Sequence, residues 1–315
     1  KCMKLGIVGS GMIVRDLLSF IHEIKDIELI HISGTQRSEE QLKDICEKHH
    51  FKRYSTNYDD LLNDEEVDTI YVALPNHLHY EYTKKALQAD KHVILEKPFT
   101  STSEEAKELK KLATSKQLFL WEAITNQYLP NYNKIKELLP MLGQIKIVED
   151  NILPAFDYTK SGGALMDLNI YNIHFVVGLF GKPHDVHYYP NVQKNIDTSG
   201  VLIIDYETFK CVCIGSKDCK APLSNNIQGD QGCIHIETPV STLDTFDVYM
   251  NGTNQTVNVN REVHRMYEEF TAFETMYQTQ DYKQCYERLE HSMIVTEIQT
   301  IARRKAGILF PADNK

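Results

Sequence analysis

Short apolar runs and amphipathic segments alternate along the first third of the chain. The apolar runs that predict strands cover residues 5–8, 27–32, 67–74, 92–95 and 117–121. The segments with helical periodicity lie between them, at residues 12–24, 39–49, 79–89 and 103–115. Because strands that alternate with helices form a parallel sheet covered on both faces, this part predicts a doubly wound α/β domain.

The pattern changes after about residue 122. A helix is expected over residues 131–139, a strand over 145–152 and a helix over 164–179. Residues 186–259 read mostly as strands and turns, with a hairpin signal at Asn251-Gly252. Helices return at residues 263–277 and 282–305.

Two domains follow from this change of pattern. We predict a first domain over residues 1–122 and a second over 123–315. The second is an α+β domain with an open, mainly antiparallel sheet, and we expect the C-terminal helix, about 285–306, to be able to pack back on the first domain.

Composition excludes several classes of function. The net charge is −10, and no basic stripe stands out, which argues against nucleic-acid binding. No apolar run approaches the roughly 20 residues that a membrane span needs. The chain enters a strand directly after Lys1, so we expect no signal peptide and a cytoplasmic protein.

Seven scattered cysteines indicate reduced thiols. Cys211 and Cys213 alternate along a predicted strand and should share one face. No second pair of ligands accompanies them, so we expect no metal site.

A glycine turn joins the first strand to the first helix. Gly9 permits a tight turn, and Gly11 leaves room for a pyrophosphate against the backbone. Met12 and Ile13 then open a helix whose free N–H groups favour phosphate. This setting predicts a dinucleotide-binding Rossmann domain; the alternative is a tight turn in another doubly wound protein.

The residues after the second strand bear on the choice of dinucleotide. Ser33, Thr35 and Arg37 lie there, and no acid precedes Glu39. Hydroxyls and an arginine suit a 2′-phosphate, whereas an acid would bind the free ribose hydroxyls. The sequence therefore favours NADP over NAD, with Arg37 as an ordinary solvated side chain being the alternative.

Three further segments extend the pattern. They are Leu74-Pro75-Asn76-His77-Leu78-His79, Leu95-Glu96-Lys97-Pro98 and the stretch from Gly162 to His174. Together with the glycine turn, they resemble the Gfo/Idh/MocA oxidoreductase family over nearly the whole chain. The resemblance is closest to the dihydrodiol and pentose dehydrogenase branch, which has tyrosine at the place of Tyr171.

The resemblance implies roles for residues at the ends of predicted parallel strands. Asn76 and Glu96 lie where open α/β sheets bind ligands, and Leu74 and His79 belong to the same cofactor segment. Lys97 is implied to be catalytic and is expected to precede a cis proline. The alternative for Lys97 is an ordinary surface lysine.

Asp167, Tyr171 and His174 are spaced to share one face of a helix. The resemblance implies that Asp167 and Tyr171 are active-site groups, and we expect His174 and Gln127 to contact substrate. The alternative is a helix-terminal charge at Asp167, a core tyrosine and a packed histidine.

A mechanism follows as a hypothesis. A hydride passes between the nicotinamide and a carbinol carbon, and a base exchanges the hydroxyl proton. Tyr171, with an intrinsic pKa of roughly 10, is our first choice once a Lys97 cation lowers its pKa. Asp167 orients Lys97 or the substrate hydroxyl. Lys97 itself is the alternative proton carrier.

The expected function is NAD(P)-dependent oxidation or reduction of a sugar, cyclic polyol or similar small molecule. One alternative is a regulator that binds dinucleotide and acts through protein partners, and another is redox-assisted glycoside cleavage. An open sheet in the second domain is expected to form a homodimer or a dimer of dimers.

The resemblance is incomplete in three places. Asn126-Gln127 stands where many relatives have a tyrosine–arginine pair, and Asn169 stands where glycine is common. The stretch 153–161 is short compared with relatives. All three border the expected substrate pocket.

Overall fold

The computed structural model describes residues 1–152 and 163–315, which divide into two compact units. Unit 1 comprises Lys1–Ala123 and Met266–Met293, and unit 2 comprises Ile124–Arg265 and Ile294–Lys315. Residues 266–293, which the sequence pattern assigned to the second domain, thus belong to unit 1. The short stretch 153–161 and the helix entry at Ser161-Gly162 lie outside the described residues.

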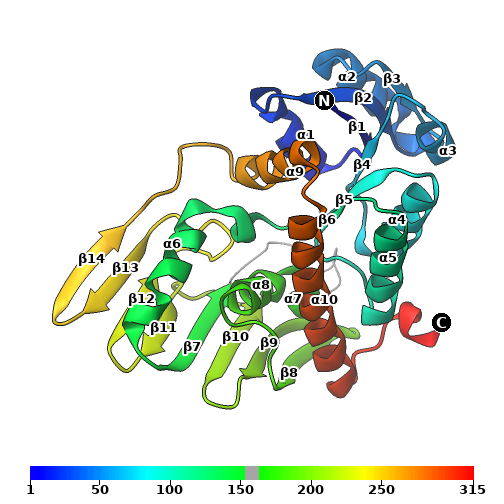
Figure 1. Ribbon diagram of the computed structural model, residues 1–315. Helices are drawn as coiled ribbons and strands as arrows, with labels where there is room; N and C mark the ends of the chain where they lie inside the picture. Colours follow the sequence, from blue (N-terminus) through cyan, green and yellow to red (C-terminus); the bar gives the residue numbers. More distant parts are fainter. Residues whose placement is uncertain (153–162) are drawn as a thin grey trace. The chain divides into compact units, whose positions relative to one another are not determined.

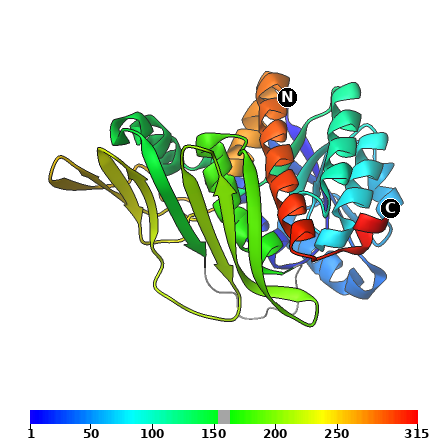
Figure 2. The same cartoon turned by 90° about the horizontal axis from the view of Figure 1, so that it is seen from below.

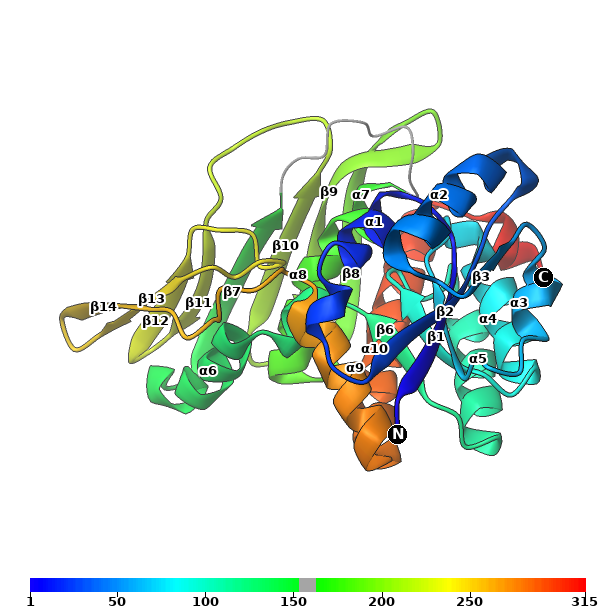
Figure 3. The same ribbon diagram turned by 90° about the horizontal axis from the view of Figure 1, so that it is seen from above.

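Unit 1 contains a six-stranded sheet in which every neighbouring pair is parallel (Figures 1 and 3). In spatial order its strands are β3 (Arg53–Ser55), β2 (Ile27–Ser33), β1 (Met3–Val8), β4 (Thr69–Val72), β5 (His92–Glu96) and β6 (Leu120–Ala123). This order confirms the predicted Rossmann sheet. The pattern missed β3 because three polar or aromatic residues form no apolar run.

Helices pack against this sheet, most of them in the connections between its strands. They are α1 (Met12–Leu18), α2 (Glu39–His49), α3 (Tyr58–Leu62), α4 (His79–Gln88), α5 (Ser103–Ser115) and α9 (Tyr267–Thr279), with short 3₁₀ turns η1 (Ile21–Glu23), η2 (Gln36–Ser38) and η3 (Asn76–Leu78). The prediction for 12–24 was too long: Ser19 closes α1, and the apolar residues beyond it continue in η1. The expected start of α5 is confirmed by a capping box between Thr102 and Glu105.

Aromatic side chains attach α9 to unit 1. Ile70 and Val72 of β4 lie in the core shared with α4 and α5, so Tyr71 points to the opposite face. There the Tyr71 ring meets Phe270 of α9 edge-on, with ring centroids 5.3 Å apart. Trp121 stacks on Phe273 at 5.4 Å. These contacts explain why a helix distant in sequence belongs to the first unit.

Unit 2 is built on an eight-stranded sheet, seen as one layer in Figure 2. In spatial order the strands are β14 (Thr253–Val257), β13 (Phe246–Met250), β12 (Gly232–Ile236), β11 (Asn225–Gly229), β7 (Ile145–Ile152), β10 (Lys210–Ser216), β9 (Ile196–Asp205) and β8 (Asp185–Gln193). Only β7 and β10 pair in parallel, which confirms a mainly antiparallel sheet. The hairpin at Asn251-Gly252 is confirmed, with φ of 53° and 74°.

Helices pack on one face of this sheet. They are α6 (Pro130–Leu138), α7 (Ala164–Asp167), α8 (Asn169–Phe180) and the end of α10 (Tyr282–Lys305), with turns η4 (Thr125–Tyr128), η5 (Leu139–Leu142) and η7 (Pro311–Asn314). The single helix predicted over 164–179 is wrong: two helices are present, and Leu168, at φ −114° and ψ −53° in the αR region, separates α7 from α8. Helical spacing alone therefore does not place Asp167 and Tyr171 on one face.

The other face of the sheet keeps large apolar side chains exposed. Ile147, Tyr189, Ile214 and Tyr249 all stand on it. Across the described part of the chain, none of the helices has the length and apolar character that crossing a membrane would require.

Asp150 is a buried carboxyl in the core of unit 2, and it predicts a pH-dependent stability. Its oxygens have no hydrogen-bond partner among the described residues, and burial raises the pKa of Asp150 well above its usual value, helped by the charge of Glu149. The folded state therefore holds a proton that the unfolded chain releases at lower pH. Stability should fall by up to about 1.4 kcal/mol per pH unit as pH rises through this window.

Asp150→Asn removes the titrating group. We expect its thermal midpoint to vary less with pH than that of the wild type and to lie higher near neutral pH. Thermal unfolding followed by circular dichroism over a pH series measures this, with the exposed Asp44→Asn as the control. Parallel pH curves for wild type and Asp150→Asn would contradict the interpretation.

Candidate dinucleotide and substrate site

Gly9 closes the turn after β1 against the neighbouring strand end. Its φ is +122°, and a Cβ there would lie 2.2 Å from the carbonyl oxygen of Ala73. Its N–H donates to the carbonyl oxygen of Ser33 at 2.9 Å. The ends of β1, β2 and β4 thus meet around a residue that can carry no side chain.

Gly11 serves a different purpose. Its φ is −79°, which any residue adopts, and a Cβ there would meet no atom within 4 Å. Met12 beside it is 80% exposed, and no side chain in the described part of the protein caps α1. The glycine therefore leaves open space at uncapped N–H groups, as an approaching phosphate needs. Gln41 of α2, which the sequence did not single out, holds this turn by donating to the carbonyl oxygen of Ser10 at 2.9 Å.

The loop after β2 combines one buried and two exposed site residues. Ser33 is buried, whereas Thr35 and Arg37 are exposed. The Thr35 and Ser38 hydroxyls lie 2.9 Å apart. Within the ranges that the structure describes, the Arg37 guanidinium makes no hydrogen bond or ion pair, so it stays available for a ligand.

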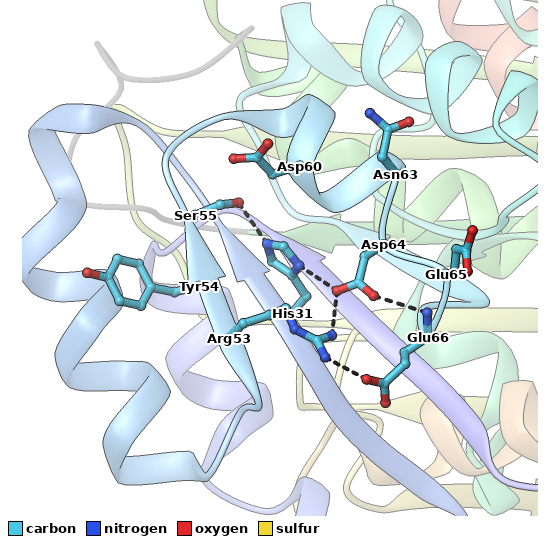
Figure 4. A pocket seen from close by; sticks show the side chains of 9 residues that line it. All are labelled: His31, Arg53, Tyr54, Ser55, Asp60, Asn63, Asp64, Glu65 and Glu66. Atoms are coloured by element: carbon cyan, nitrogen blue, oxygen red, sulfur yellow. Dashed lines mark hydrogen bonds and ion pairs between the residues drawn. The ribbon is translucent and has the colours of Figure 1, made fainter.

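The Ser33 hydroxyl belongs to a network of polar side chains. The other members of this network line a shallow hollow of about 590 Å³ (Figure 4). The Ser33 hydroxyl lies 3.1 Å from that of Ser55, which lies 2.7 Å from Nε2 of His31. Nδ1 of His31 lies 2.8 Å from Asp64, and Arg53 donates to the same carboxylate at 2.7 Å.

This network fixes the orientation of the His31 ring. Burial acts to raise the pKa of Asp64, but hydrogen bonds from His31, Arg53 and the Glu66 backbone lower it below its usual value. The ionised carboxylate accepts the Nδ1–H of His31, so Nε2 faces Ser55. Because these groups bond to one another, we interpret them as support for the strand ends; no local sequence signal joins positions 31 and 64.

His79 is a buried bridge between the two cofactor segments. Its Nε2 lies 2.8 Å from the carbonyl oxygen of Leu74, and its Nδ1 lies 2.7 Å from that of Pro98. Burial lowers the pKa of His79, and its bonds to the carbonyls oppose that shift. The ring therefore contributes by holding both segments in place.

Glu96 and Lys97 follow β5. Oε1 of Glu96 accepts from the Tyr71 hydroxyl at 2.8 Å, and Oε2 accepts from the Lys97 N–H at 3.0 Å. The Lys97–Pro98 bond is cis, as expected. Lys97 is half-buried in unit 1, and the short turn that opens at Asn76 lies at the same sheet edge.

In unit 2, Asp167 forms an ion pair that the sequence did not predict. Oδ2 of Asp167 lies 2.7 Å from Nζ of Lys217, and the lysine side chain is only 1% exposed against 26% for the aspartate. The two residues stand 50 positions apart. The only hint of this ion pair in the sequence is a lysine directly after an apolar strand.

Tyr171, His174 and Gln127 differ in exposure. Tyr171 is half-buried, and its carbonyl oxygen accepts from Asn126 at 3.0 Å. His174 is fully buried, and its carbonyl oxygen accepts from the nearly buried Gln127 at 2.9 Å. Asn126 and Gln127 thus anchor α8, which favours a packing role for His174 and Gln127 over substrate contact.

The predicted site residues fall into two groups. The glycine turn, the loop after β2 and the segments at Leu74 and Lys97 share one sheet edge of unit 1. Asp167 and Tyr171 belong to unit 2.

Known proteins match the whole chain. Residues 3–124 match the Gfo/Idh/MocA oxidoreductase family, described as having an NAD-binding Rossmann fold. A scyllo-inositol 2-dehydrogenase (NADP+) of Bacillus subtilis (strain 168) is 27% identical over 99% of both chains. Residues 3–124 are thus similar to this family, and the relative is similar over nearly the whole chain. A trans-1,2-dihydrobenzene-1,2-diol dehydrogenase of Xenopus laevis is 24% identical over 98% of this chain and 99% of its own.

Solved structures share the fold. A 3-ketoreductase from Actinomadura kijaniata in complex with NADP has a TM-score of 0.83 at 20% identity, covering 96% of this chain and 97% of its own. A biliverdin reductase from Synechocystis in complex with biliverdin and NADP+ has a TM-score of 0.79 at 20% identity, covering 97% and 99%. These two likenesses show that the fold is shared.

The two glycines should respond differently to alanine. Gly9→Ala places a methyl against the Ala73 carbonyl at a φ that costs about 1–3 kcal/mol for other residues, so it should lower the thermal midpoint. Gly11→Ala should fold normally but bind dinucleotide at least about tenfold more weakly, because its methyl enters the open approach.

Thermal unfolding and fluorescence titration with reduced dinucleotide measure the two effects. Gly252→Ala, at a hairpin of unit 2, controls for a glycine with positive φ that lies far from this turn in the sequence. Unchanged dinucleotide affinity of a folded Gly11→Ala variant would remove the assigned role of Gly11.

Proposed function

We propose that this protein is an NADP-dependent dehydrogenase or reductase acting on a sugar, a cyclic polyol or a related hydroxy or carbonyl compound. The observation that carries the proposal is the open approach at Gly11, next to the tight turn at Gly9. The inositol and dihydrodiol dehydrogenases that match nearly the whole chain support the substrate class.

The residues of unit 1 fit a dinucleotide. The pyrophosphate would lie at Gly11, Met12 and Ile13, where N–H groups are uncapped. Thr35 and Arg37 would meet the adenosine ribose beside Ser33. An exposed guanidinium in a loop that has no acid before Glu39 favours a 2′-phosphate. Leu74, Asn76 and Glu96 would border the nicotinamide half.

Residues of this chain would carry out the proton transfer. The bound nicotinamide supplies or accepts a hydride at the substrate carbon. Tyr171 would exchange the proton of the substrate hydroxyl, and Lys97 is the alternative proton carrier. Asp167 would accept a hydrogen bond from a substrate hydroxyl and so orient it.

We further propose that two or four copies assemble through the open sheet of unit 2. Ile147, Tyr189, Ile214 and Tyr249 give this face an apolar character that water disfavours. Light scattering of the purified protein tests this: a monomer would contradict it, and Ile214→Lys should weaken an assembly. All seven cysteines are unpaired, which supports the cytoplasm as its location.

Turnover tests the function directly. The absorbance of reduced nicotinamide would be followed with NADP and then NAD, against inositols, aldoses, sugar phosphates and cyclic diols, and in reverse with carbonyl compounds. We expect turnover with at least one neutral hydroxy compound and preference for NADP. Failure to bind either dinucleotide would overturn the proposal.

Replacing the proton-transfer groups should separate chemistry from binding. Tyr171→Phe should lower kcat on the order of 100-fold or more, with dinucleotide affinity nearly unchanged. Lys97→Met should lower kcat at least as much, because it removes the cation that the proposal places beside the reacting atoms.

Tyr128→Phe, a hydroxyl deletion in the turn that precedes α6, serves as the matched control. If Lys97→Met abolishes turnover and Tyr171→Phe does not, Lys97 carries the proton itself.

A further inference from the structure

Lys217 is a buried cation in unit 2. It directly follows β10, and its N–H donates to the carbonyl oxygen of Thr198 at 2.8 Å. Its side chain is 1% exposed, and Nζ lies 2.7 Å from Oδ2 of Asp167. Because an ammonium group out of water needs a counter-charge, this lysine depends on the Asp167 carboxylate.

The backbone around Asp167 is held by a second carboxylate. Asp197 of β9 accepts the N–H of Leu165 at 2.8 Å and the Tyr188 hydroxyl at 2.6 Å. A Cβ on Gly163, where φ is +95°, would lie 1.8 Å from Asp197, so this position excludes a side chain. These contacts therefore hold the backbone at the start of α7, just before Asp167 in the sequence.

The charge of Lys217 acts on both carboxylates. Burial raises the pKa of Asp197, while the bonds from Tyr188 and Leu165 and the charge of Lys217 oppose that shift. Titratable side chains on the neighbouring segments include Tyr188 on β8, Asp197 on β9 and Asp218, next to Lys217. Lys217 forms an ion pair with Asp167 and lowers the pKa of Asp197 by its charge.

We propose that Lys217 is the positioning residue for Asp167: its ammonium keeps the carboxylate ionised and fixes the direction in which it faces a substrate hydroxyl. This inference rests on the proposed function, which makes Asp167 a substrate-orienting group. Lys217 is closed off from solvent, so it acts on a ligand only through Asp167, which is 26% exposed.

The two lysines of the site then differ in their tasks. Lys97 acts beside the reacting atoms, and Lys217 acts one contact away from the substrate. An aspartate kept ionised by a buried lysine accepts hydrogen bonds, which selects hydroxyl donors over carboxylate or phosphate groups at this place.

Stability measures the ion pair independently of turnover. Lys217→Met and Asp167→Asn should each lower the thermal midpoint, because each leaves one charge without its partner. The combined variant should lose less than the sum of the two, and the exposed Lys146→Met should change nothing. Additive losses would show that the two residues do not interact in solution and would overturn the proposal.

Kinetics measure the positioning role, with the compound that the wild type turns over. Lys217→Met should lower kcat/KM at least about tenfold, with dinucleotide affinity unchanged within about twofold. Lys217→Arg should recover part of the rate, since it keeps the charge. In an Asp167→Asn background, Lys217→Met should cost little more.

The outcomes distinguish the two proposals. Wild-type turnover with an undiminished kcat/KM of the Lys217→Met variant overturns the positioning role alone. A wild type that binds dinucleotide but turns over none of the compounds overturns the proposed function and this inference together.

Discussion

The contact between Gly9 and the carbonyl oxygen of Ala73 sets the geometry on which the first unit depends. At 2.2 Å from a would-be Cβ, the oxygen leaves no room for a side chain, so β1 and β4 end side by side with only backbone between them. The N–H of Gly9 also joins the end of β2 through Ser33. Loops that leave these strand ends therefore start from fixed points at one sheet edge, where a dinucleotide is bound in open α/β sheets.

Buried polar groups hold the backbone segments that lie farther from this turn. His79 ties the Leu74 segment to Pro98, and the chain of contacts from Asp64 through His31 and Ser55 reaches Ser33. Removing a polar group from water costs free energy unless the group is hydrogen-bonded, so each of these side chains has few alternative orientations. The ligand-facing residues are consequently exposed on loops whose supports are buried and hydrogen-bonded.

The same need to pair buried polar groups explains an ion pair in the second unit. A lysine without access to water must lie against a carboxylate, and Asp167 meets that need while remaining partly exposed. If Asp167 orients the substrate as proposed, stability and substrate orientation are coupled in one ion pair. The side-chain amides of Asn126 and Gln127 are also buried and bonded, and they anchor the backbone of α8.

Local sequence determined much of the fold and part of the candidate site. The strand and helix periods of the first 122 residues, the glycine turn and the hairpin at Asn251-Gly252 depend on neighbours along the chain, so they could be predicted. Tertiary structure alone decided that α9 packs on unit 1, that Leu168 interrupts the helix after Asp167, and that Lys217 pairs with Asp167. Backbone strain and hydrophobic periodicity depend on a few neighbouring residues. The partner of a buried ring or charge depends instead on which distant segment the fold places beside it.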